Sequence, residues 1–133
     1  MDSLVIDTNV VSYILKNTRL GKRYGVRLHG HPLLISFMTL AELFHWADHA
    51  KWGQSRRQHL ERELTRYVAV HSTPGLCELW ARVRYERRRQ PISAEDAWIA
   101  ATALEHDCLL VTHNPRDFRG ISNLVVITEA TST

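Results

Sequence analysis

The sequence predicts an α/β domain with a mainly parallel sheet of about five short strands. Short, continuous apolar segments alternate with longer segments of helical periodicity, which is typical of strands covered by helices on both faces. A chain of 133 residues has the usual length of one domain, so we expect a single domain over residues 1–133. With 44% hydrophobic and 23% charged residues, the composition is that of an ordinary globular protein and excludes disorder.

The strands are predicted at apolar runs that do not alternate with polar residues. Runs of this kind indicate strands whose two faces are both buried. The five predicted strands are Leu4–Ile6, Leu33–Ile35, Tyr67–Val70, Leu109–Val111 and Leu124–Ile127.

Helices are predicted between the strands, where apolar residues recur with helical spacing. Leu60 and Leu64 are spaced in this way, and Pro74 suits the first turn of a helix. Gly75 is expected to mark a helix end. The predicted helices cover residues 39–52, 55–66, 74–89 and 93–106.

Four acids are predicted to meet at the carboxyl edge of the sheet, where open α/β sheets gather their sites. Asp7 directly follows the first strand, and Asp117 comes shortly after the strand that ends at Val111. Glu42 and Asp96 are expected in the first turn of a helix, whose positive dipole end favours an ionised carboxylate. Neighbouring carboxylates repel one another unless a cation lies between them.

A divalent cation is the occupant that this set of ligands favours. Oxygen donors without an organised set of Cys or His prefer Mg²⁺ or Mn²⁺ to Zn²⁺. We therefore predict that the four acids are both metal ligands and catalytic residues, while Thr8, Thr112 and Asn114 orient them or bind phosphate and water. Such a site activates a water molecule for in-line attack on phosphorus.

Each acid also has a purely structural interpretation. The spacing of Thr39 and Glu42 fits a capping box, and Ser93 to Asp96 is a looser version of the same motif. Asp7 could cap the first helix, and Asp117 could be a turn residue. The residues alone leave these alternatives open.

Four blocks of the sequence carry a resemblance to a known family. The segment Leu4–Leu15 resembles the opening strand and helix of PIN-domain ribonucleases, and more narrowly those of VapC-type toxins from bacterial toxin–antitoxin pairs. Three further blocks agree in order and spacing: Ile35–Leu43, Ile92–Leu104 and Leu110–Phe118. The resemblance runs essentially end to end. It implies a PIN-like three-layer α/β/α domain whose acidic quartet is the four acids named above.

The resemblance also implies a function. The protein is expected to be a Mg²⁺- or Mn²⁺-dependent endoribonuclease that hydrolyses RNA phosphodiester bonds. It would be the toxin of a type II pair and would inhibit translation and growth. The implied partners are an RNA substrate, such as tRNA or another structured RNA, a cognate VapB-like antitoxin and a second copy of the chain in a homodimer.

Three alternatives to this function stay open. The first is a non-catalytic RNA-binding or scaffolding module with the PIN fold, and the second is a PIN nuclease in RNA processing outside a toxin–antitoxin pair. The third is a phosphatase or receiver-type domain, which also has an Asp after its first strand. A dehalogenase-like phosphatase, however, needs a second Asp where this chain has Asn9.

The basic residues favour a nucleic acid or an acidic peptide as partner. Lys and Arg total 17 against 14 Asp and Glu, and 14 of the 17 are Arg, whose guanidinium group pairs well with phosphate. Arg116, Arg87 and Arg88 are candidates for RNA contacts. The run of arginines over residues 82–89 could equally be the solvated end of a helix.

Other sequence features narrow the class further. No apolar run approaches the ~20 residues that cross a bilayer, and no secretory signal is evident, so a cytoplasmic location is expected. Cys77 and Cys108 match neither a disulfide scaffold nor a metal motif. His45 and His49 lack the glutamate of a zinc-protease motif, and His113 is interpreted as a loop residue.

Overall fold

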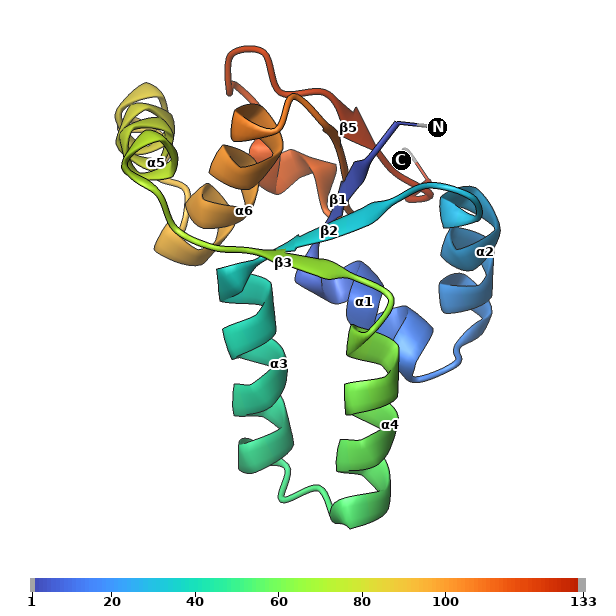
Figure 1. The fold of residues 1–133 in the computed structure, drawn as a ribbon. Helices are drawn as coiled ribbons and strands as arrows, with labels where there is room; N and C mark the ends of the chain where they lie inside the picture. Colours follow the sequence, from blue (N-terminus) through green and yellow to red (C-terminus); the bar gives the residue numbers. More distant parts are fainter. Residues whose placement is uncertain (1, 132–133) are drawn as a thin grey trace.

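The computed structural model describes residues 2–131 and has a five-stranded parallel sheet between two layers of helices (Figure 1). The strands lie in the order β3-β2-β1-β4-β5, and every neighbouring pair is parallel. This arrangement confirms the predicted α/β class and its parallel sheet. The strands are β1 (Leu4–Ile6), β2 (Leu33–Ser36), β3 (Val68–Val70), β4 (Leu109–Val111) and β5 (Val126–Ile127).

Helices connect the successive strands, because two parallel strands cannot be joined by a tight hairpin. The pair α1 and α2 joins β1 to β2, α3 and α4 join β2 to β3, and α5 and α6 join β3 to β4. A short 3₁₀ helix, η1 (Pro115–Phe118), follows β4. The α-helices are α1 (Thr8–Leu15), α2 (Arg19–Leu28), α3 (Phe37–His49), α4 (Gln54–Leu64), α5 (Pro74–Glu86) and α6 (Ala94–Glu105).

Successive strand residues face opposite helix layers, which explains the continuous apolar runs in the sequence. Ile6 and Ile35 belong to the core on the side of α1 to α4, whereas Val5 and Leu110 belong to the core beneath α5 and α6. Figure 1 shows α3 and α4 running antiparallel and extending away from the sheet. None of the helices within residues 2–131 has the length and apolarity needed to cross a membrane.

Helix α2 was not predicted, because two glycines and several cations weaken its helical signal. Its N-cap is Thr18, whose hydroxyl accepts a hydrogen bond from the N–H of Gly21 at 2.9 Å. At Gly21 the backbones of α1 and α2 approach closely, since a Cβ atom there would lie 2.2 Å from the carbonyl oxygen of Tyr13. This contact allows α2 to bury Tyr24 and Leu28 against the rest of the fold.

Several predicted helix boundaries are wrong, and α3, for example, ends at His49 and not at residue 52. Helix α3 begins at Phe37 because the hydroxyl of Ser36, and not that of Thr39, caps it by accepting from the N–H of Met38 at 3.1 Å. Glu42 consequently lies in the second turn of α3, not in the first. Gly75 lies inside the first turn of α5, and that helix ends at Glu86, before the last three arginines of the run.

We predict that Gly21→Ala lowers the free energy of unfolding by about 1–3 kcal/mol, because the added methyl group would separate α1 from α2. The matched control is Gly25→Ala on the same helix. A Cβ atom there meets nothing within 4 Å, so this change should stabilise the protein by about 0.5–1 kcal/mol. Urea denaturation followed by circular dichroism measures both values, and equal stability of the two variants would contradict the close approach.

Candidate active site

The four predicted acids come together at the carboxyl edge of the sheet. Asp7 follows β1, Glu42 is on α3 after β2, Asp96 is in the first turn of α6, and Asp117 is in η1 after β4. Burial is the largest cause of the raised pKa values of Asp7 and Asp96. The negative charges of Glu42 and Asp117 raise the pKa of Asp7 further, and those of Asp7 and Asp117 raise the pKa of Asp96 further. The acids therefore lie close enough to influence one another's ionisation.

Asp7 is held by both of its carboxylate oxygens. The backbone N–H of Thr8 donates to Oδ1 at 2.8 Å, and the hydroxyl of Thr112 donates to Oδ2 at 2.7 Å. Asp7 is the N-cap of α1, so its structural interpretation is confirmed, but a cap needs only one of the two oxygens. The side chain is only 4% exposed, and this burial raises its pKa to about 6 although both hydrogen bonds act in the opposite direction.

Glu42 is held by a chain of hydroxyl groups. The hydroxyl of Thr8 donates to Oε1 of Glu42 at 2.8 Å, and Oγ1 of Thr39 lies 2.9 Å from Oγ1 of Thr8. Because Thr8 has one proton and donates it to Glu42, Thr39 must donate to Thr8. Burial raises the pKa of Glu42, the hydrogen bond from Thr8 opposes this, and the charges of Asp96 and Glu95 raise it further.

Asp96 occupies the third position of α6. The hydroxyl of Ser93 accepts from the backbone N–H of Asp96 at 3.0 Å, so Ser93 caps the helix as predicted. Burial raises the pKa of the Asp96 carboxyl to about 6, and the hydroxyl of Ser93 lowers it in part. Glu42, Glu95 and Asp96 line the same cavity of about 420 Å³ between α3 and α6.

Asp117 is exposed, and its loop is fastened to the end of α5. The guanidinium group of Arg87 donates to the carbonyl oxygens of Asp117 and Arg119 at 2.8 and 2.9 Å, and to that of Gln90 at 2.7 Å. Arg87 therefore binds protein carbonyls and fixes the main chain at Asp117. Arg87 remains a candidate for RNA contacts from the sequence, with a structural role that the sequence did not indicate.

The other two predicted RNA-binding arginines differ in their surroundings. Arg116 lines a cleft of about 550 Å³ together with Asn114 and Asp117. Arg88 instead lies over the ring of Tyr85, with its guanidinium carbon 4.1 Å from the ring centre. Of these two arginines, only Arg116 lines the cleft beside one of the four acids, Asp117.

The donor set suits a hard divalent cation in its chemistry. Its donors are carboxylate and hydroxyl oxygens, and the raised pKa values show that negative charge is costly at this site, so a positive charge there would favour the ionised acids. Among residues 2–131, however, no three side chains of His, Cys, Asp or Glu are already gathered into a set that could hold a metal ion. The structure thus has an acidic cluster and not a closed set of metal ligands.

The sequence matches the family model of the PIN domain over residues 4–124. The chain belongs to the PIN domain family. The match spans all of the segments that carry the four acids and thus confirms the resemblance stated from the sequence blocks.

Relatives of this PIN domain are similar along nearly their whole length. Ribonuclease VapC1 of Haemophilus influenzae (strain R2866) is 29% identical over 125 residues, which cover 90% of this chain and 92% of the relative. The tRNA(fMet)-specific endonuclease VapC of Shigella flexneri is 25% identical, with coverage of 93% and 96%.

Solved structures show the same fold. VapBC-1 from nontypeable Haemophilus influenzae is 27% identical, with a TM-score of 0.74 over 96% of this chain and 98% of that one. VapBC2 from Rickettsia felis, bound to a DNA fragment from its promoter, has a TM-score of 0.83 at 23% identity and covers 95% and 98%. The second likeness is evidence for the shared fold alone.

Two polar residues of this PIN domain were missed as parts of the site. Thr39 donates to the hydroxyl that holds Glu42, and Glu95 adds negative charge beside Glu42 and Asp96. The sequence did carry a signal for Thr39, which lies one helical turn before Glu42, but the same spacing also fits a capping box. Glu95 gave no separate signal because acids are common in the first turn of a helix.

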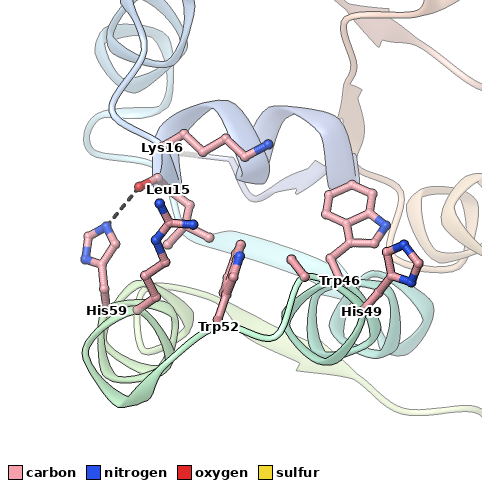
Figure 2. Close-up of a pocket in the computed structure, with 8 residues that line it drawn as sticks. Leu15, Lys16, Trp46, His49, Trp52 and His59 are labelled. Carbon is pink, nitrogen blue, oxygen red and sulfur yellow. Dashed lines mark hydrogen bonds between the residues drawn. The ribbon is translucent and has the colours of Figure 1, made fainter.

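A third hollow, of about 610 Å³, lies between α1, α3 and α4, away from Asp7 (Figure 2). Trp46 and Trp52 line it with apolar surface, and no acid is among its lining residues. In Figure 2, a ring nitrogen of His59 points at the carbonyl oxygen of Leu15, at a distance of 2.8 Å. The cationic groups at the rim are Lys16 and Arg56. The hollow therefore combines an apolar floor with a basic rim.

We predict that Asp7→Asn raises the stability of the metal-free protein at neutral pH. The folded pKa of Asp7, about 6, is above the ordinary 3.8, so the folded state loses stability as the pH rises from about 4 to about 7. For this buried group the loss is about 2–3 kcal/mol. Thermal melts in a chelator across this range should therefore show a higher melting temperature for Asp7→Asn at pH 7 and a similar one at pH 4.

The control for this prediction is Glu61→Gln, which removes an exposed acid of α4. It should follow the wild-type melting curve at every pH. If Asp7→Asn also follows that curve, the buried carboxylate of Asp7 does not lower the stability of the folded protein, and the prediction is wrong.

Proposed function

We propose that this PIN domain is a Mg²⁺- or Mn²⁺-dependent endoribonuclease and the toxin of a type II toxin–antitoxin pair. The observation that carries the proposal is the group of four acids at one sheet edge, with Asp7 fixed between Thr8 and Thr112. The similarity to proteins named ribonuclease VapC and to solved VapBC complexes supports the same conclusion. RNA is the substrate class that those names imply.

In this proposal the three acids Asp7, Glu42 and Asp96 hold the cation, and Asp117 completes the cluster. A bound divalent cation polarises the phosphodiester and lowers the pKa of water. The chain's own hydrogen bonds fix the direction of the acids, since Asp7 is held from two sides and Glu42 from one.

The arginines supply the other half of the proposed site. Arg116 lies beside Asp117 in the cleft, so it can pair with an RNA phosphate next to the one that is cleaved. The backbone N–H of Asn114 donates to the hydroxyl of Thr112 at 3.0 Å. The side chain of Asn114 is exposed and is therefore accessible to a substrate. Roles for Asn114, Arg87 and Arg88 in binding RNA stay predictions.

We predict that the purified protein cleaves RNA with Mg²⁺ or Mn²⁺ and that Asp7→Asn and Asp96→Asn each lower the rate at least a hundredfold. Each substitution removes a negative charge that the cation needs. The assay follows cleavage of total RNA and of tRNA on denaturing gels, with Glu61→Gln as the control that keeps wild-type activity.

A second measurement separates loss of the site from loss of the fold. Mn²⁺ should raise the melting temperature of the wild type but not that of Asp7→Asn. If the wild type binds RNA without cleaving it in either metal, the non-catalytic binding module is the better function. If both Asp7→Asn and Asp96→Asn still cleave RNA, these two acids have only a structural role at the helix N-termini.

We infer that the hollow between α1, α3 and α4 receives an apolar segment of an antitoxin. Its tryptophan floor fits apolar side chains, and its basic rim, which includes Lys16 and Arg56, fits acidic residues beside them. The similarity to solved toxin–antitoxin complexes supports a protein partner. A homodimer and a cytoplasmic location stay predictions from the sequence.

We predict that Trp52→Ala weakens binding of the antitoxin at least tenfold, because aromatic residues in desolvated hollows dominate interface energies. The antitoxin to test is the product of a small reading frame that adjoins this one, where the genome carries one, and it is co-expressed and titrated by calorimetry. Tyr85→Ala, which removes an aromatic side chain that is 65% exposed on α5, is the control. Equal affinity of the two variants would exclude the hollow as the interface, and both should still cleave RNA.

A further inference from the structure

Tyr24 of α2 joins three segments that are far apart in the sequence. Its side chain is fully buried, and its hydroxyl lies 2.7 Å from Nδ1 of His113, with which it shares a hydrogen bond. The same hydroxyl accepts a hydrogen bond from the backbone N–H of Glu129 at 3.0 Å. It also lies 3.4 Å from the carbonyl oxygen of Thr112. One buried hydroxyl thus contacts both the segment after β4 and the segment after β5.

The ring of His113 is fixed from two sides. The rings of Tyr13 and Tyr24 meet it edge to face, with centroid distances of 5.6 and 5.7 Å and angles close to perpendicular. The neighbours of His113 in the chain are Thr112, which donates to Asp7, and Asn114, whose N–H donates to Thr112. His113 therefore lies in the same stretch of main chain as Thr112, the residue that holds Asp7.

The segment after β5, residues 128–131, is clasped to α2 by Glu129. Its carboxylate accepts from Nε of Arg27 at 2.6 Å and from Nη2 of Arg23 at 3.1 Å, and the hydrogen bond from Arg27 lowers the pKa of Glu129. Thr128 and Ala130 of this segment line the same cleft as Arg116. The cleft is thus lined by two segments, one after β4 and one after β5, that both contact Tyr24 of α2.

We propose that Tyr24 is a positioning residue for the nuclease site, acting through His113 on the loop that carries Thr112 and Asp117. The inference rests on the proposed function. When the hydroxyl is removed, His113 and Glu129 lose their shared partner, the loop becomes less ordered and Thr112 holds Asp7 less well. Tyr24 touches neither the substrate nor a cation, so it affects the rate through the arrangement of the acids.

The test compares Tyr24→Phe with Tyr67→Phe in the whole protein. Both changes remove one hydroxyl from a buried tyrosine, but the hydroxyl of Tyr67 donates to Glu63 at 2.8 Å, far from the carboxyl edge. Only Tyr24→Phe should lower kcat for RNA cleavage, by about tenfold, while KM changes less than twofold. A purely structural role for Tyr24 predicts that both variants lose stability and neither loses kcat.

Two further measurements keep the proposal decidable. In ¹H–¹⁵N spectra of the metal-free protein, the amide signal of Asn114 should shift in Tyr24→Phe and stay unchanged in Tyr67→Phe. His113→Phe keeps an aromatic ring at this position and removes the same hydrogen bond, so it should reproduce the loss of kcat. The double variant should be no slower than either single one. If Tyr24→Phe fails to fold, His113→Phe decides alone.

The outcomes separate this inference from the proposed function. An unchanged kcat in an active protein, or additive losses in the double variant, overturns the positioning role. If the wild type cleaves no RNA, the proposed function fails, and the Asn114 signal then tests the positioning of the loop by itself. An unshifted Asn114 signal in Tyr24→Phe overturns the positioning role of Tyr24.

Discussion

The burial of one carboxylate, that of Asp7, is the constraint on which the rest of the carboxyl edge depends. A charge with so little access to water is costly unless hydrogen bonds or an opposite charge compensate for it. The N-terminal amide of α1 and the hydroxyl of Thr112 provide part of that compensation, and the raised pKa shows that it is incomplete. A positive charge beside Asp7, at the point where three chain segments meet, would therefore be favourable.

Hydroxyl groups link the acids to the surrounding helices and loops by hydrogen bonds. Thr8 connects α1 to α3 through Thr39 and Glu42, while Thr112 connects β1 to the loop after β4. Threonine suits these positions because its hydroxyl can donate to a carboxylate while it accepts from another group. The acids are therefore oriented by uncharged neighbours, which leaves their negative charge free for a cation.

The sequence was sufficient for those features that depend on chain-local patterns, namely the five strands, the location of Asp7, Glu42 and Asp117 after parallel strands, and that of Asp96 in the first turn of a helix. The sequence was insufficient for features that depend on contacts between segments far apart in the chain. Helix α2 owes its stability to packing at Gly21, and the partners of Arg87 are carbonyls that the fold brings to it. Thr39 was misassigned because a capping box and a hydroxyl relay have the same spacing, and only the neighbouring Thr8 distinguishes them.

The close approach of α1 and α2 at Gly21 has a consequence for how this sequence can vary. Gly21 has no side chain and no chemical role, yet the depth at which α2 sits determines whether Tyr24 reaches His113. In a survey of tolerated substitutions, this position would be as restricted as a carboxylate of the site. Its neighbour on the same helix, Gly25, would accept many residues, because open space surrounds it. Intolerance to mutation at Gly21 would then reflect a backbone contact that acts on the site only through Tyr24 and His113.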